Sequence, residues 1–173
     1  MKTFDELAIS PLIKGNIAHA KLITPTPVQA GAIPPALLGK DVLGTAQTGT
    51  GKTLAFAVPI LERLIQSPAA GVSALVLVPT RELAMQVYDT FARIGRGSRL
   101  SAVLVVGGLS ESRQLDEIRR GAQIVIATPG RLNDYIKRHL VNLQNVKVLV
   151  LDEAARMVDM GFLPQMRSIM NAL

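Results

Sequence analysis

The chain has 173 residues, of which 49% are hydrophobic and 3% aromatic, and its 19 lysines and arginines exceed its 13 acidic residues to give a formal net charge of +6. This composition excludes a disordered tail, and the absence of cysteine excludes disulfides and thiolate metal sites. The positive charge suits a polyanionic partner such as nucleic acid or a nucleotide, but it suits equally a basic protein that binds neither.

The N-terminus and the apolar runs give an expectation about location. Asp5 and Glu6 stand where a signal peptide requires an apolar core. No apolar run approaches the ~18 residues of a membrane span. We therefore expect a soluble, cytoplasmic protein with no membrane association.

Residues 4–38 carry no strong strand pattern and are rich in proline. The prolines are Pro11, Pro25, Pro27, Pro34 and Pro35. The pattern predicts short helices, and one of them should begin at Thr26 or Pro27, because threonine caps helices well and proline fits their first position.

From residue 42 onward, short apolar runs alternate with longer amphipathic stretches. The predicted strands are Val42–Gly44, Ala74–Val78, Ala102–Val106, Ile124–Ala127 and Val146–Leu151. The predicted helices are Lys52–Ile65, Arg81–Ile94, Ser112–Arg120, Arg131–Lys137 and Leu163–Leu173, with 157–162 assigned to packing and a turn. Strands that are apolar at almost every position suit a parallel sheet covered on both faces. We therefore predict an α/β fold with right-handed crossovers and helices on both faces of the sheet.

A glycine-rich segment precedes the first long helix. It consists of Ala46, Gln47, Thr48, Gly49, Thr50, Gly51, Lys52 and Thr53. The glycines let backbone N–H groups turn toward phosphate oxygens, at the positive end of the helix dipole. We expect Lys52 to contact the β- and γ-phosphates and the Thr53 hydroxyl to ligate Mg²⁺. Ala46 departs from the strict glycine of this pattern but is also small, and the alternative is a glycine-rich turn that opens an ordinary helix.

Two adjacent acids, Asp152 and Glu153, follow the last apolar run. At the carboxyl end of a parallel strand, Asp152 is placed to hold Mg²⁺ through water and Glu153 to polarise the attacking water. The alternative is a strand that simply ends in solvated acids. We predict that both acids converge with Lys52 and Thr53 around one magnesium–triphosphate group.

Six collinear motifs together resemble the N-terminal RecA-like domain of DEAD-box RNA helicases, over essentially the whole chain. They are Phe4 with Pro25–Gln29, Ala46–Thr53, Pro79–Ala84, Gly107–Gly108, Thr128–Arg131 and Asp152–Ala154. The resemblance implies a RecA-like P-loop fold, ATP and Mg²⁺ as cofactors, and RNA as a partner. It implies ATP hydrolysis coupled to the unwinding of RNA duplexes.

The resemblance also implies roles for residues. Gln29 would hydrogen-bond the adenine edge, and Phe4 would stack on the base. The backbone of one RNA strand would be gripped by Pro79, Thr80, Arg81, Glu82, Gly107, Gly108, Thr128, Pro129, Gly130 and Arg131. Because Arg81 and Arg131 each follow a strand near the start of a helix, they are placed to bind phosphate, and we expect sequence-tolerant binding. Taken alone, either arginine would more often be a surface charge or part of a helix-end ion pair, and only the collinear set of motifs reverses that interpretation.

Two departures from the family pattern alter the expected activity. The fourth residue of the Asp-Glu-Ala-Asp motif is Ala155, whose methyl group cannot accept the hydrogen bonds that link the nucleotide site to a Ser-Ala-Thr motif. The chain also ends at Leu173, before a Ser-Ala-Thr strand and a second RecA-like domain. We therefore expect an adenine-recognition element at 1–38, a partial RecA-like domain at 39–173, and impaired hydrolysis. We also expect either a rearranged sheet or self-association between copies.

Three functions remain open from the sequence. The chain suits part of an ATP-dependent RNA helicase, or a module that binds adenine nucleotide and RNA without hydrolysis. A different P-loop enzyme, such as a kinase or transporter ATPase, lacks support because no substrate lid or transporter signature is present. No ligand constellation surrounds His19 or His139. A solvated basic face is the interpretation for Arg93, Arg96, Arg99, Arg119 and Arg120.

Overall fold

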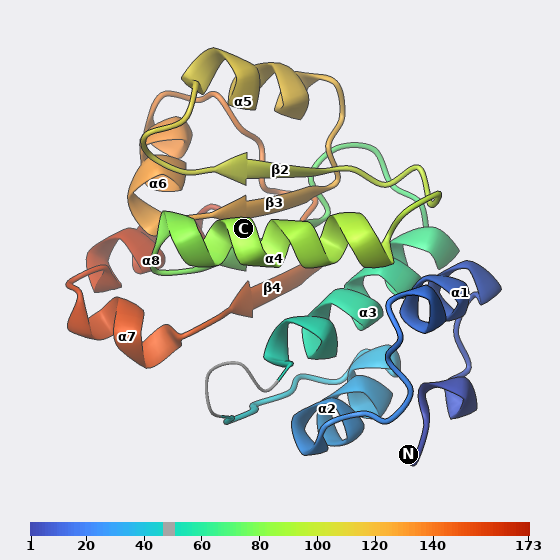
Figure 1. Ribbon diagram of the computed structural model, residues 1–173. Helices are drawn as coiled ribbons and strands as arrows, with labels where there is room; N and C mark the ends of the chain where they lie inside the picture. Colours follow the sequence, from blue (N-terminus) through green and yellow to red (C-terminus); the bar gives the residue numbers. More distant parts are fainter. Residues whose placement is uncertain (47–50) are drawn as a thin grey trace. The chain divides into compact units, whose positions relative to one another are not determined.

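The computed structural model describes residues 1–46 and 51–173. The chain forms two compact units (Figure 1). The helical unit comprises Met1–Pro68 with Thr90–Leu100, and the sheet unit comprises Ala69–Asp89 with Ser101–Leu173. None of the helices in the described residues is both long and apolar enough to cross a membrane.

The helical unit contains the short helices predicted for the N-terminal region. Its elements are η1 (Phe4–Glu6), α1 (Pro11–His19), α2 (Pro27–Leu37) and α3 (Lys52–Gln66), together with the last turns of α4 (Arg81–Ile94). Both α1 and α2 pack on α3. Their contacts bury Ile13, Ile33 and Val58 completely, so an aliphatic core holds the unit together.

Helix α2 begins as the sequence predicts, with Thr26 as its cap and Pro27 in its first turn. Gln29 N donates to Thr26 Oγ1 at 3.4 Å, and Thr26 N donates to Gln29 Oε1 at 2.9 Å. This reciprocal pair is a capping box, which satisfies two backbone donors at the start of the helix.

Helix α1 begins at a buried carboxylate of α3. Ser10, the residue before Pro11, donates its N–H to Glu62 Oε2 at 2.9 Å and its hydroxyl to Glu62 Oε1 at 3.1 Å. Gln66 Nε2 donates to the same Oε1 at 2.8 Å, and Glu62 is only 6% exposed. The carboxylate thus links the start of α1 to α3.

The sheet unit is built on four parallel strands in the order β2-β3-β1-β4. The strands are β1 (Ala74–Leu77), β2 (Ala102–Val105), β3 (Ile124–Ala127) and β4 (Val148–Leu151). Every residue of β1 and β3 is buried, so both faces of the sheet centre are covered, as the sequence predicts. The helices that follow the strands, apart from α4, are α5 (Glu111–Arg119), α6 (Pro129–Lys137), α7 (Ala154–Asp159) and α8 (Leu163–Asn171).

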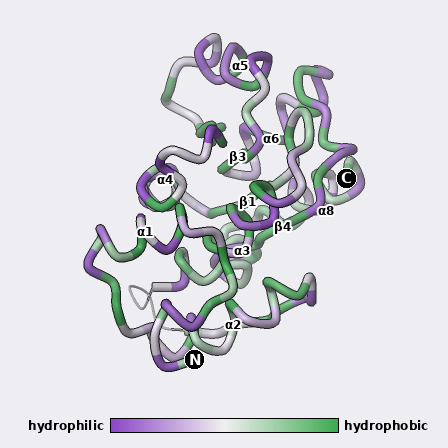
Figure 2. Tube along the Cα trace, turned by 90° about the vertical axis from the view of Figure 1, so that its right-hand side faces the viewer, coloured by the Kyte–Doolittle hydropathy of each residue, from purple (hydrophilic) through white to green (hydrophobic). Residues whose placement is uncertain are grey.

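One face of the sheet packs on residues from α5 to α8. Leu75, Val103 and Val125 come from three neighbouring strands and belong to this core. The residues that meet them from the helices are Leu115, Leu132, Tyr135, Met157, Met166 and Ile169. The outward side of α5 is solvated, and the helix is mostly hydrophilic in Figure 2.

One prediction about an element is wrong. Val42–Gly44 forms no strand, and Leu43 is 97% exposed, because no strand of the described residues pairs with this segment. The sheet of the described residues therefore has four strands instead of the five predicted, and β4 lies at its edge. Residues 157–162 agree with the predicted packing and turn, since Met157 is fully buried and a turn at Met160 and Gly161 follows α7, although the helix itself was not predicted. The other elements agree with the predictions to within about two residues, which is the usual uncertainty of helix and strand ends.

Candidate functional site

The four strands of the sheet unit end level with one another. Leu77 lies opposite both Ala127 and Leu151, and Ala127 lies opposite Val105. The segments that follow the strands therefore all leave the sheet at one edge, the one formed by the carboxyl ends of the strands. These segments begin at Val78, Val106, Thr128 and Asp152 and contain all the residues predicted to bind RNA and both predicted catalytic acids.

Two arginines flank the double glycine at this edge. Gly108 has a φ of +81°, and a Cβ atom added to it would collide with Arg81 Nη1. A Cβ atom on Gly107 would lie 4.0 Å from Arg131 Nη2. The sequence separates these residues by 20 or more positions, yet the fold brings both guanidinium groups to the same turn. That these arginines and glycines grip the backbone of one RNA strand stays a prediction.

Each arginine lies in the first turn of a helix. Arg81 is the first residue of α4, and the Thr80 hydroxyl accepts the N–H of Leu83 at 3.2 Å. Arg131 is the third residue of α6, which starts at Pro129 after Thr128. Helix starts carry unpaired N–H groups and the positive end of the dipole, so each guanidinium adds to a local field that favours an anion.

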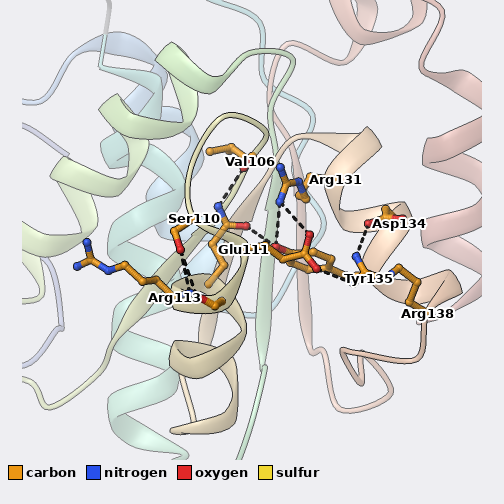
Figure 3. Close-up of polar contacts among 10 residues, drawn as sticks. Val106, Ser110, Glu111, Arg113, Arg131, Asp134, Tyr135 and Arg138 are labelled. Atoms are coloured by element: carbon orange, nitrogen blue, oxygen red, sulfur yellow. Dashed lines mark hydrogen bonds and ion pairs between the residues drawn. The ribbon is translucent and has the colours of Figure 1, made fainter.

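The Arg131 guanidinium is held by a buried polar chain (Figure 3). Its Nη1 donates to the Tyr135 hydroxyl at 3.3 Å, and its Cζ lies 5.7 Å from the centre of the Tyr135 ring. The Tyr135 hydroxyl donates to Gln114 Oε1 at 2.6 Å, and Gln114 Nε2 donates to Val106 O at 3.0 Å. These hydrogen bonds connect Arg131 to the backbone carbonyl just before Gly107. They therefore fix the position of the arginine relative to the double glycine.

Arg131 also belongs to a network of four charged side chains. Glu111 Oε2 lies 3.6 Å from Arg131 Nη1, while Glu111 Oε1 accepts from Arg138 Nη2 at 2.6 Å. Arg138 Nη1 also donates to Asp134 Oδ2 at 2.9 Å. The hydrogen bond from Arg138, aided by the charge of Arg131, holds the pKa of Glu111 below its ordinary value, and the same hydrogen bonds raise the pKa of Arg138.

Four residues of this network were not predicted from the sequence: Glu111, Gln114, Tyr135 and Arg138. The spacing of Arg131 and Tyr135 places them on one face of α6, which is a signal of contact. Glu111 and Gln114 belong to α5, more than 15 residues away along the chain, and no pattern in the sequence pairs them with α6.

The two predicted catalytic acids lie at the end of β4. The Asp152 N–H donates to Leu77 O at 3.0 Å, which extends the ladder by one residue, and Asp152 is 7% exposed. Glu153 follows with a φ of 58°, a left-handed conformation that is uncommon for a residue other than glycine. Such conformations concentrate at functional turns, and this one directs the chain into α7. The Ala155 side chain is exposed at the start of that helix.

The predicted nucleotide residues lie in the helical unit. Gly51 precedes α3 with a φ of +83°, and Lys52 and Thr53 are the first two residues of the helix. Gln29 Nε2 donates to Gly51 O at 3.1 Å, so the amide that was predicted to recognise adenine touches the phosphate segment. Phe4 is 4% exposed, which leaves little of its ring available to a base. Gln47, Thr48, Gly49 and Thr50 lie outside the described residues.

The structure thus assembles two groups of predicted residues. Gln29 meets Gly51 beside Lys52 in one unit, and the two arginines meet the double glycine in the other. The convergence of Lys52 and Thr53 with Asp152 and Glu153 stays a prediction. In the described part of the chain, no cluster of three or more histidine, aspartate or glutamate side chains is arranged to hold a metal.

Comparison with known proteins agrees with the motifs and the sheet. A sequence model described as DEAD/DEAH box helicase matches residues 26–173. The chain is 44% identical over 174 residues to the protein named DEAD-box ATP-dependent RNA helicase 40 of Arabidopsis thaliana. This match covers 99% of this chain and 16% of that protein. It superposes on the crystal structure of a DEAD box protein from the hyperthermophile Methanococcus jannaschii with a TM-score of 0.92 and 37% identity, over 98% of this chain and 46% of that one. The chain therefore spans less than half of either relative. With its four-stranded parallel sheet and its collinear motifs, the chain belongs to the DEAD/DEAH box helicase family.

Proposed function

We propose that the chain is the N-terminal RecA-like part of an ATP-dependent RNA helicase, which binds Mg-ATP and the backbone of one RNA strand. In the whole protein these two events would couple ATP hydrolysis to the opening of RNA duplexes. The proposed RNA binding is supported by one observation: Arg81 lies against Gly108 and Arg131 lies near Gly107.

The double glycine suits a phosphate because it has no side chain to keep a backbone at a distance. A Cβ at Gly108 would already collide with Arg81, so the arginine occupies space that only glycine leaves open. Phosphate oxygens that approach this turn would accept hydrogen bonds from both guanidinium groups. Contacts of this kind recognise sugar and phosphate and carry little information about bases, so the expected binding tolerates any sequence.

In the nucleotide half, Gln29 supports adenine recognition. Its Oε1 accepts from Thr26 N and its Nε2 donates to Gly51 O, which uses one lone pair and one hydrogen of the amide. The second hydrogen and the second lone pair match the N7 acceptor and N6 donor of adenine. The two protein contacts would hold the amide in a fixed orientation.

The remaining nucleotide residues are assigned from their positions. Lys52 and Thr53 begin α3, where the helix dipole favours the β- and γ-phosphates. When bound, Mg²⁺ would neutralise phosphate charge, and the Thr53 hydroxyl and the Asp152 carboxylate are the groups proposed to hold it. Glu153 is proposed to orient and deprotonate the attacking water.

Ala155 favours a second candidate function, in which the chain binds both ligands without hydrolysing ATP. A methyl group in place of a carboxylate cannot accept a hydrogen bond, and removing one polar group from an active site costs about 100-fold or more in rate. We propose that this chain by itself binds nucleotide and RNA and does not unwind duplexes.

The proposal is tested by measuring the anisotropy of a fluorescent single-stranded RNA against the parent chain, Arg131→Gln and Arg81→Gln. Both substitutions should weaken binding by a factor of about 10, since each removes one phosphate contact of about 1–2 kcal/mol. Arg119→Gln is the matched control, because Arg119 is an exposed arginine of α5 whose ion pair is with Asp116. If all three variants lost the same RNA affinity, the loss would follow from net charge alone. The assignment of an RNA site to Arg81 and Arg131 would then be wrong.

A further inference from the structure

The Glu111 carboxylate lies between two arginines with different surroundings. Its Oε1 accepts a 2.6 Å hydrogen bond from Arg138, and its Oε2 lies 3.6 Å from Nη1 of Arg131. We propose that Glu111 is an internal competitor of RNA, which occupies Arg131 in the free protein and yields it to a backbone phosphate. This inference rests on the proposed function, because it assigns a regulator to the same RNA site.

Arg131 does not depend on Glu111 for its position. The guanidinium lies against the Tyr135 ring and donates to the Tyr135 hydroxyl, and Tyr135 is itself fully buried. The hydroxyl is held in turn by the buried amide of Gln114. An Arg131 that lost its acidic neighbour would therefore remain beside Gly107, with its charge available to a phosphate.

Glu111 likewise does not depend on Arg131. Its shorter contact, at 2.6 Å, is to Arg138, the residue directly after α6, which is also anchored to Asp134 of that helix. When a phosphate takes Arg131, Glu111 keeps this hydrogen bond and gives up only the longer ion pair. The free-energy cost of this exchange is therefore small, because long ion pairs near the surface contribute little to stability.

The expected effect of Glu111 on binding has two parts. Its carboxylate offsets the positive charge of Arg131, and it lies where an arriving phosphate would feel repulsion. Both parts are screened by salt, so the effect should fade as ionic strength rises. Arg138 reduces the effect by drawing the carboxylate away from Arg131.

The first test measures the affinity of Glu111→Gln for a fluorescent single-stranded RNA across a salt series. We expect binding tighter than the parent by a factor of about 3–10 at low salt, and a slope of log affinity against log salt that is steeper than the parent's, because the repulsion from Glu111 is screened as salt rises. Asp116→Asn is the matched control, because it also removes one negative charge from α5, and Asp116 is an exposed acid whose ion pair is with Arg119. Its affinity should stay within about 2-fold of the parent.

The second test changes the partner of Glu111 instead. In Arg138→Gln the carboxylate keeps only Arg131, so RNA binding should fall below that of Arg119→Gln, which removes the same charge elsewhere. This comparison decides the question if Glu111→Gln does not fold, as judged by its circular dichroism and unfolding transition.

The outcomes separate this inference from the proposed function. If the parent binds RNA and Glu111→Gln binds no more tightly than Asp116→Asn, the competitor role is wrong and the RNA site stands. If Arg138→Gln and Arg119→Gln bind equally well, the competitor role is also wrong. If neither the parent nor any variant binds RNA, the proposed function fails and this inference fails with it.

Discussion

Gln29 and Gly51 are 22 residues apart in the chain and share a 3.1 Å hydrogen bond from the side-chain amide of one to the backbone carbonyl of the other. A Cβ atom on Gly51 would collide with that amide. Gln29 also closes the capping box of α2. One side chain therefore ties the start of α2 to the start of α3, and it does so beside the residues proposed to bind ATP.

We expect Gln29→Ala to lower both stability and nucleotide selectivity. The loss of the capping box and of the bond to Gly51 should reduce the free energy of unfolding by about 1–2 kcal/mol. Removing the adenine contacts should narrow the preference for ATP over GTP. Denaturant unfolding and competition between the two nucleotides measure these effects, and Gln144→Ala, at an exposed loop, is the control. Equal binding of ATP and GTP by the parent would refute the adenine assignment.

Gly108→Ala should weaken RNA binding through Arg81. Alanine at a φ of +81° costs about 1 kcal/mol of stability, and its Cβ must also displace the Arg81 guanidinium. Gly121→Ala is a matched control, because Gly121 has a φ of +98° but open space around its Cβ. We expect a similar loss of stability in both variants and a loss of RNA affinity, of about 5-fold or more, in Gly108→Ala alone. If both variants bind RNA as well as the parent does, Arg81 is not a phosphate ligand at this turn.

Ala155→Asp restores the fourth residue of the family motif in α7. We expect neither the parent nor this variant to release phosphate from ATP in the presence of RNA, because the proposed complete site takes additional groups from a second RecA-like domain. A coupled phosphate-release assay measures this directly. Turnover that appears in Ala155→Asp would show instead that the chain carries a complete hydrolytic site disabled at one position.

Glu62→Gln should destabilise the helical unit. Its carboxylate accepts two hydrogen bonds from Ser10 and one from Gln66. The side-chain NH₂ group of a glutamine would face one of these donors and could not accept its hydrogen bond. The expected loss is about 1–3 kcal/mol, the cost of an unsatisfied buried group. Glu117→Gln, on α5, is the control and should change the unfolding free energy by less than about 0.5 kcal/mol. A Glu62 variant as stable as this control would mean that the α1–α3 link contributes nothing.

Glu111 should make stability depend on pH in acid. Arg138 and Arg131 lower its pKa in the folded protein, while the nearby Asp134 opposes them. A carboxylate with a lowered folded pKa contributes stability above its unfolded value, about 4.3, and loses that contribution as pH falls through the folded value. The stability difference between the parent and Glu111→Gln should therefore shrink from about pH 6 to about pH 3. A difference that stays constant over this range, measured by denaturant unfolding, would contradict the ion-pair network.

Much of the fold could be predicted from the sequence because its signals are local. The runs at β1 and β3 are apolar at every position, which identifies parallel strands buried on both faces, and the Thr26-Pro27 pair identifies the start of α2. Val42–Gly44 has the same local character and is not a strand. A strand exists only with a partner, and the sequence of the segment alone does not show whether a partner is present.

The sequence by itself determined the family, the motifs and the two arginines that follow strand ends, because each depends on residue type and spacing along the chain. Only the tertiary structure decided what Arg131 touches. The level ends of the parallel strands bring α5 beside α6, and this places Glu111 and Gln114 against an arginine and a tyrosine from a distant segment. Side-chain contacts between separate helices depend on how the helices pack, and no periodicity within either helix encodes them.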